Sequence, residues 1–157
     1  FLSSRTSSWV MQFRPSTGEV IELIEGPFMS QHDVDIESDS TIIFFNNGGQ
    51  TLKGDRPSQH RLAENLIEVA PQFSGVVRYH LGSETFESIY PELFAENEIF
   101  SFTESLVEEL PGGGYYIEEQ NSSVLWVLKD GEVKYKNILR SQHEGHHHLA
   151  NWGRVMP

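Results

Sequence analysis

Residues 123–138 read SVLWVLKDGEVKYKNI, two runs of alternating apolar and polar residues joined at Asp130-Gly131. Alternation with a period of two is typical of half-buried strands, and Asp-Gly is a strong signal for the tight turn of a hairpin. A second hairpin of this kind is predicted around Gly18, and no segment carries a long helical period. The sequence therefore predicts an all-β fold.

A third hairpin is predicted at 63–81, with its turn at Gly75, so hairpins lie near 8–24, 63–81 and 123–138. The three turn glycines are 57 and 56 residues apart, and a valine-containing strand follows each. Further strands between the hairpins bring each repeat to four strands, which indicates antiparallel four-stranded blades of a β-propeller. The predicted strands lie near 8–13, 19–24, 41–45, 64–70, 76–81, 115–119, 123–128 and 132–138.

A chain of 157 residues has the length of one domain and holds about two and a half such repeats. Propellers close with at least four blades. The chain is therefore part of a larger propeller, or several copies complete a ring, or the repeats form an open stack. We favour the first arrangement and treat 1–157 as one partial propeller domain, with a polar loop at 48–60 and a His-rich C-terminal segment at 142–157.

Composition excludes several classes of function. Eleven Lys and Arg residues against 23 Asp and Glu give a net charge of −12, which argues against nucleic acid as a partner. The absence of cysteine excludes disulfides and thiolate chemistry. No apolar run is long enough to predict a membrane span. Repeated acidic residues are predicted to form a solvated outer surface: Glu92, Glu96, Glu98, Glu104, Glu108, Glu109, Glu118 and Glu119.

The first candidate for chemistry is Gln31-His32-Asp33, which precedes a predicted strand. An imidazole oriented by a neighbouring group can act as a base or a nucleophile. Because adjacent strand residues point to opposite faces, His32 and Asp33 form a pair only if the strand begins after them. In the alternative interpretation, Asp33 holds a turn and His32 packs between blades.

Near the C-terminus, residues 143–148 contain four histidines and Glu144, a composition that suits zinc or nickel but also an exposed loop. We predict neither a metal nor a cofactor. Residues 151–154 are expected to form a strand. Six aromatic residues are expected to pack between blades: Phe94, Phe100, Phe102, Tyr115, Tyr116 and Trp126.

Several of these segments together resemble the arylsulfate sulfotransferase family over most of residues 8–140. The Gln31-His32 element, the strand end Phe45-Asn46-Asn47-Gly48 and an Arg61-bearing strand after a polar loop match the family's pattern. Leu110-Pro111 and the hairpin at 130–133 resemble its last blades. Asn46 stands where the family usually has Asp.

The resemblance implies part of a six-bladed propeller, periplasmic or secreted, that transfers a sulfuryl group between phenols without a nucleotide sulfate donor. The partners it implies are a phenolic sulfate donor, a phenol acceptor and the remaining blades or other chains. His32 matches the family's nucleophilic histidine, and Asn47-Gly48 matches the end of its Phe-Asp-Asn-Gly element. The sulfuryl oxygens need cations, and the local candidates are Lys53, Arg56, His60 and Arg61.

The competing hypothesis is a non-catalytic propeller that presents loops to a protein or glycan partner. For an enzyme, we expect His32 to open onto a channel within reach of basic side chains. One ring nitrogen would be free to attack, and the other would be held by a carboxylate or a backbone carbonyl. An apolar or acidic channel would favour the scaffold.

Overall fold

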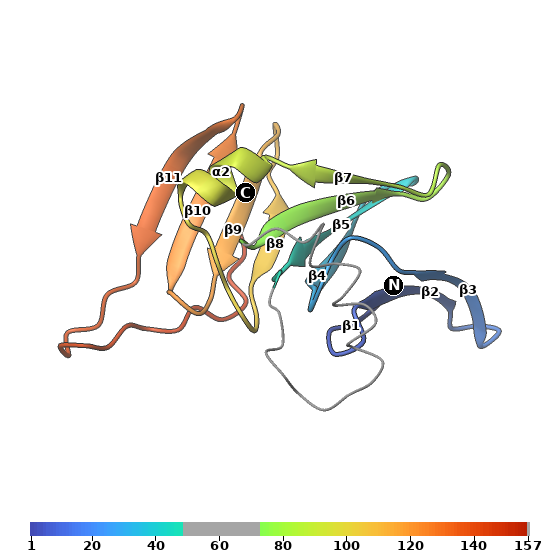
Figure 1. Ribbon diagram of the computed structural model, residues 1–157, viewed down its shortest axis with the longest axis horizontal. Helices are drawn as coiled ribbons and strands as arrows, with labels where there is room; N and C mark the ends of the chain where they lie inside the picture. Colours follow the sequence, from blue (N-terminus) through green and yellow to red (C-terminus); the bar gives the residue numbers. More distant parts are fainter. Residues whose placement is uncertain (49–72, 157) are drawn as a thin grey trace.

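The computed structural model describes residues 1–48 and 73–156, whose strands form three antiparallel sheets (Figure 1). The first contains β1 (Leu2–Ser4), β2 (Trp9–Arg14) and β3 (Glu19–Ile24). The second contains β4 (His32–Ser38), β5 (Thr41–Asn46), β6 (Gly75–His80) and β7 (Thr85–Ile89). The third contains β8 (Leu106–Glu109), β9 (Tyr115–Glu119), β10 (Val124–Lys129) and β11 (Glu132–Ile138).

Strands of the same sheet pair in chain order, and the sheets follow one another across the molecule (Figure 1). The predicted all-β fold is confirmed, and sheets of three and four strands are consistent with propeller-like blades. Gly18 and Gly131 have φ angles of 71° and make the turns of the β2–β3 and β10–β11 hairpins, as predicted.

The turn predicted at Gly75 is wrong. Gly75 is the first residue of β6, and it pairs with Asn46 of β5 and not with a strand before it across a tight turn. The turn of this sheet that corresponds to Gly131 is formed by residues 81–84. Gly75 therefore does not occupy the same place in its sheet as Gly18 and Gly131 do in theirs, and the even spacing of the three glycines does not mark a structural repeat. The predicted strand at 64–70 and residues 49–60 of the polar loop lie outside the described residues.

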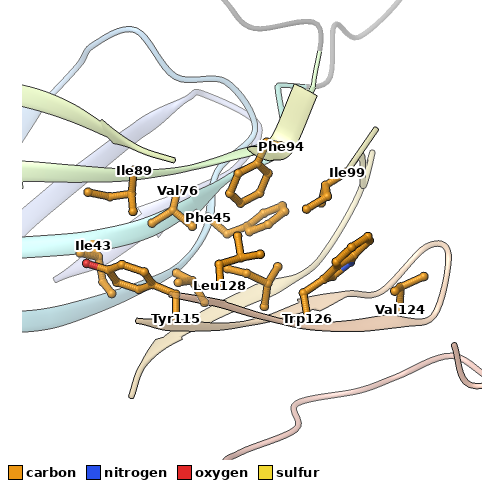
Figure 2. Close-up of a cluster of buried hydrophobic side chains, with 12 residues drawn as sticks. Ile43, Phe45, Val76, Ile89, Phe94, Ile99, Tyr115, Val124, Trp126 and Leu128 are labelled. Atoms are coloured by element: carbon orange, nitrogen blue, oxygen red, sulfur yellow. The ribbon is translucent and has the colours of Figure 1, made fainter. Parts of the chain in front are cut away.

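Strand β5 lies at the centre of the fold because it is buried on both faces. Its sequence, TIIFFN, is buried at every position. Ile43 and Phe45 pack toward the third sheet, whereas Ile42 and Phe44 belong to a second cluster with residues of the first sheet (Figure 2). Each fully buried side chain of this size contributes about 1.5–3 kcal/mol. This explains why an unbroken apolar run, rather than alternation, marks the strand.

A short helix, α2 (Pro91–Glu96), follows β7, with Pro91 in its first turn and Phe94 buried between the second and third sheets. Phe94 packs near Phe45, with ring centroids 6.4 Å apart (Figure 2). Of the aromatic residues predicted to lie between blades, Phe100 and Phe102 are instead 38% and 40% exposed. No helix in the described part of the chain is long and apolar enough to cross a membrane.

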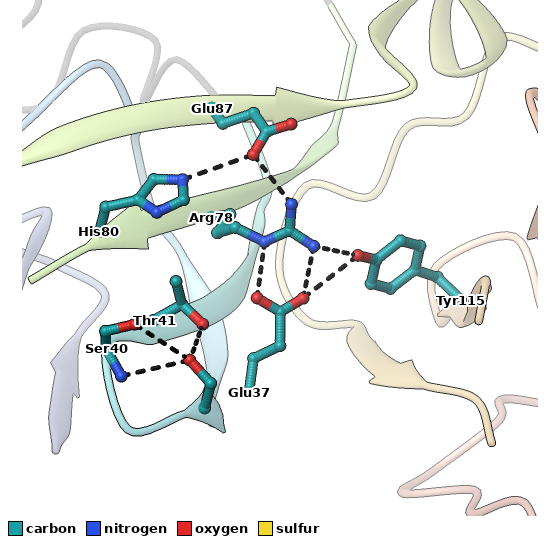
Figure 3. Close-up of polar contacts among 8 residues, drawn as sticks. Glu37, Ser40, Thr41, Arg78, His80, Glu87 and Tyr115 are labelled. Carbon is teal, nitrogen blue, oxygen red and sulfur yellow. Dashed lines mark hydrogen bonds and ion pairs between the residues drawn. The ribbon is translucent and has the colours of Figure 1, made fainter. Parts of the chain in front are cut away.

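Arg78 on β6 links the second and third sheets through a polar cluster (Figure 3). Its Nε and Nη2 atoms donate to the two carboxylate oxygens of Glu37, both at 2.6 Å. Nη1 donates to Glu87 at 2.9 Å, and Nη2 also donates to the Tyr115 hydroxyl at 2.6 Å. Burial raises the pKa of Glu37, but hydrogen bonds from Arg78, Thr41 and Tyr115, together with the positive charge of Arg78, outweigh burial and hold that pKa below its usual value.

Candidate functional site

The candidate site lies where β4 begins and β5 ends. His32 is opposite Phe45 in the β4–β5 ladder, and Asn47 follows the last residue of β5. The pairing is irregular between His32 and Asp35, and Asp33 has a φ of 54°, in the left-handed region. Asp is one of the few residues found there with some frequency. This bulge breaks the regular alternation at His32 and Asp33.

The side chain of His32 is held by the side-chain amide of Asn47. The expected partner, a carboxylate or a backbone carbonyl, is not the one that the structure shows. His32 Nδ1 lies 2.7 Å from Asn47 Oδ1. Asn47 is fully buried, and its Nδ2 donates to the backbone carbonyls of Ser101 at 2.7 Å and Glu104 at 2.8 Å. Because carbonyls only accept, the amide nitrogen must face them and the amide oxygen must face His32.

This arrangement sets the tautomer of a neutral His32. An amide oxygen has no proton to donate, so Nδ1 carries the hydrogen and Nε2 keeps its lone pair. His32 is half-buried. The site thus holds an imidazole with an available nitrogen and a fixed orientation, which is the arrangement that nucleophilic or general-base chemistry requires.

Asp33 makes different contacts. Its Oδ2 accepts a hydrogen bond from the Val107 amide at 2.9 Å, and Oδ1 lies 3.7 Å from Arg154 Nη2. Burial, with the negative charge of Asp35 nearby, raises the pKa of Asp33 to about 6. The carboxylate of Asp33 therefore contacts β8 and Arg154, whereas the His32 ring contacts Asn47.

The raised pKa of Asp33 makes stability depend on pH. Because the folded protein holds the Asp33 proton more tightly than the unfolded chain does, Asp33 favours the folded state most below pH 4. This contribution to stability is lost as pH rises through about 6. We expect the melting temperature of Asp33→Asn, relative to the unaltered protein, to rise between pH 4 and pH 7. The difference corresponds to at most about 3 kcal/mol. Thermal melts across this range test it, with exposed Asp39→Asn as the control; parallel curves for Asp33→Asn and the unaltered protein would contradict it.

His32 opens onto a cavity of about 490 Å³. Its wall is made by the start of β4, the start of β8, the end of β9 and a segment near the C-terminus. The lining residues are His32, Glu104, Ser105, Leu106, Glu118, Gln120, Leu149, Asn151 and Trp152. Two carboxylates and no Lys or Arg stand among these lining residues. The basic side chains expected near His32 all belong to 49–72, outside the described part of the chain.

Two buried amides hold the backbone around His32. Gln31 is fully buried, and its Nε2 lies 2.7 Å from the Trp9 carbonyl and 3.1 Å from Ser3 Oγ, in the first sheet. Asn46 Oδ1 accepts from the amides of Met29 at 2.8 Å and Gly48 at 3.1 Å. An Asp at position 46, as in the family's pattern, could accept the same two hydrogen bonds. Asn46 therefore preserves this contact although the residue type differs.

Among the predicted site residues, His32 and Asn47 are brought together. Arg61 lies outside the described residues, as do Lys53, Arg56 and His60. The four histidines at 143–148 are exposed on either side of a turn at Glu144-Gly145, and no cluster of three or more metal-ligating side chains occurs in 1–48 or 73–156. Residues 151–154 do not form the predicted strand.

Sequence reasoning missed Glu118 and Trp152 as cavity residues. Glu118 and Glu119 were predicted on the solvated surface, but they are 2% and 4% exposed. A signal existed in Tyr115-Tyr116-Ile117-Glu118-Glu119, since a strand buried on both faces shows no alternation. Trp152 is distant in sequence, and no pattern links it to His32.

Comparison with protein families gives one match. A family model described as arylsulfotransferase (ASST) matches residues 1–138, a span that ends with the last residue of β11. The comparisons with curated proteins and with solved structures found no match. The matched span includes His32 and Asn47 and excludes the C-terminal residues of the cavity wall.

Proposed function

Because this chain belongs to the arylsulfotransferase family, we propose that it transfers sulfuryl groups between phenols, with His32 as the group that carries the sulfuryl between donor and acceptor. The observation that carries the proposal is the 2.7 Å contact between His32 Nδ1 and Asn47 Oδ1. It leaves Nε2 as the nitrogen with a free lone pair.

The reaction has two displacements at sulfur. In the first, the Nε2 lone pair attacks the sulfur of an aryl sulfate, the N–S bond forms, and the S–O bond to the aryl group breaks. The donor leaves as a phenolate and takes up a proton from solvent. In the second, the oxygen of the acceptor phenol attacks the same sulfur, the N–S bond breaks, and the phenolic proton is released. His32 is then neutral again.

Asn47 acts as a positioning residue in this scheme. Sulfuryl transfer to Nε2 leaves positive charge on the ring, and the Asn47 amide oxygen stabilises the Nδ1–H that shares it. The cavity of about 490 Å³ beside His32 is within the usual range for small-ligand sites of 300–1,000 Å³. It has room for one aromatic ring and a sulfate group.

Cations are also required, because charge develops on the sulfuryl oxygens. The described residues of the cavity wall include no Lys or Arg, and the carboxylates of Glu104 and Glu118 would disfavour an anion there. We therefore propose that Arg61 supplies the cation, since it follows the Asn47 strand in the pattern shared with the family. This role of Arg61 rests on sequence and on chemical need.

The acidic wall favours the second candidate function, a non-catalytic module that binds a protein or glycan. The two functions are separated by an assay with 4-nitrophenyl sulfate as donor and phenol as acceptor. An enzyme releases 4-nitrophenol at a rate that depends on phenol and needs no nucleotide. A binding module gives no release above the solvent rate.

Variants of Asn47 test its positioning role. We expect Asn47→Ala to lower kcat by about 10²-fold with a change in donor KM below about threefold, because the ring loses its orientation and tautomer. Loss of the buried hydrogen bonds costs about 2 kcal/mol of folding free energy. Asn47→Asp keeps an acceptor for Nδ1–H and is expected to retain a higher kcat than Asn47→Ala.

Steady-state kinetics and thermal melts of the same preparations check these values. Asn137→Ala on β11, outside the cavity lining, is the control and should retain kcat. A merely structural role for Asn47 predicts loss of stability with kcat unchanged per folded molecule.

A further inference from the structure

The segment 149–156, here called the strap, lies beyond the part of the chain matched by the family model. It forms no strand, yet it is attached to the second and third sheets at specific points. Three of its residues, Leu149, Asn151 and Trp152, line the His32 cavity.

Glu118 on β9 is the main attachment point. Its Oε1 accepts a hydrogen bond from the Trp152 amide at 3.0 Å, and Oε2 accepts one from the Gly153 amide at 2.7 Å. Trp152 has a φ of 57°, which turns the two successive amides toward one carboxylate. Successive backbone N–H groups in such a turn bind anions well. This accounts for a carboxylate that is only 2% exposed.

Two further carboxylates hold the strap. Glu108 on β8 accepts a hydrogen bond from the Val155 amide at 3.2 Å, and Asp33 on β4 lies 3.7 Å from Arg154 Nη2. The strap is therefore attached to strands of both four-stranded sheets, next to the cavity that they form with His32.

Gly153 shows that the fit is close. A Cβ added there would lie 2.6 Å from the Tyr116 hydroxyl oxygen and 2.7 Å from Glu118 Oε2. Real Cβ atoms essentially never come within 3.0 Å of another atom, so the ends of the Tyr116 and Glu118 side chains would have to shift. A side chain at this position would therefore push against the carboxylate that accepts the Gly153 amide.

We propose that the strap is a specificity element of the His32 cavity, in which the Trp152 indole binds the aromatic ring of the phenol. Trp152 is 64% exposed and lines the cavity, so its indole is accessible to a ligand bound there. Its backbone is fixed by Glu118, so the indole borders the cavity at little cost in ordering. The proposal rests on the proposed function for the identity of the ligand.

The first experiment tests the attachment, by limited trypsin digestion of the protein. Gly153→Ala is expected to increase the rate of cleavage after Arg154 several-fold, because the added methyl group displaces the strap from Glu118. Cleavage after the exposed Arg140, which lies outside the strap, is the internal control and should not change. Equal rates after Arg154 in the two proteins would overturn the attachment.

The second experiment measures binding of 4-nitrophenol by calorimetry. Trp152→Ala is expected to raise Kd by about 3- to 10-fold, the range for loss of one aromatic contact, and Trp152→Phe to change it by less than about twofold. An unchanged Kd in Trp152→Ala, an equal loss in Trp152→Phe, or no binding by the unaltered protein would overturn the proposal.

These results are independent of catalysis, because binding of the phenol requires no sulfuryl transfer. If the variants bind as expected but sulfuryl transfer survives loss of His32, the proposed function fails and the strap proposal stands. If transfer depends on His32 but binding does not depend on Trp152, the strap proposal fails alone.

Discussion

Replacing His32 with alanine is expected to lower the rate of sulfuryl transfer from 4-nitrophenyl sulfate to phenol by at least about 10³-fold. The variant loses the imidazole nitrogen, Nε2, that the contact between Nδ1 and Asn47 leaves free beside the cavity. Because His32 is half-buried and makes one described hydrogen bond, to Asn47, the fold should lose about 1 kcal/mol, or roughly 2–4 °C in melting temperature.

The control is His80→Ala on β6 of the same sheet. His80 is a partly exposed histidine whose Nε2 lies 3.5 Å from Glu87, and it does not line the cavity. We expect this variant to retain transfer. If His32→Ala instead lowers the melting temperature strongly and keeps its rate per folded molecule, His32 is a packing residue and the proposed function is wrong.

The largest effect on stability is expected from Arg78→Met. This change leaves the Glu37 carboxylate, whose side chain is only 9% exposed, without its cation. Removing one partner of a buried ion pair costs about 3–5 kcal/mol of folding free energy. Because the Arg78 side chain is 22% exposed, we expect a loss at the low end of this range, about 3 kcal/mol. Thermal melts at pH 7 should show a fall of roughly 6–12 °C.

Two further measurements identify the cause. The double variant Arg78→Met with Glu37→Leu should recover most of the loss, because no charge remains buried. Arg78 holds the pKa of Glu37 below its usual 4.5, whereas burial without Arg78 raises it. As pH falls from 7, Glu37 therefore becomes neutral first in Arg78→Met, and the stability difference between the two proteins should shrink.

Lys134→Met serves as the control, because it removes an ion pair with Glu132 that lies on the exposed outer strand. Its melting temperature should match that of the unaltered protein. A fall as large as that of Arg78→Met would show that the loss is not specific to the buried cluster.

The sequence predicts the hairpins β2–β3 and β10–β11 well because their turns need positive φ and contain Gly18 and Gly131. Gly75 misled the prediction since a glycine also occurs at the start of a strand, and no local pattern separates these uses. Strand β7 was not predicted, because Thr85–Ile89 is an outer strand with little apolar alternation.

Burial of charge is harder to predict. Glu118 and Glu119 follow three buried residues on β9, and their partners are the backbone amides of the strap and the Trp126 indole. Such partners lie far along the chain or on the next strand, so composition assigns these carboxylates to solvent. Only the packing of the sheets shows otherwise.

In the candidate site, too, one feature could be predicted from the sequence and another could not. His32 and Asn47 are 15 residues apart, and the antiparallel pairing of β4 with β5 is enough to bring them together. Asn47 as the partner of Nδ1 was not predicted, because the choice depends on the Ser101 and Glu104 carbonyls, which fix the amide from another part of the chain.

The most direct test of the account is whether His32 becomes sulfated. The protein is incubated with 4-nitrophenyl sulfate without acceptor, digested with trypsin and analysed by mass spectrometry. The peptide of residues 6–53, in which His32 is the only histidine, is predicted to gain the mass of one SO3 group and to lose it when phenol is added. Turnover of the donor with this peptide unmodified, or with the group on another residue, would contradict the account.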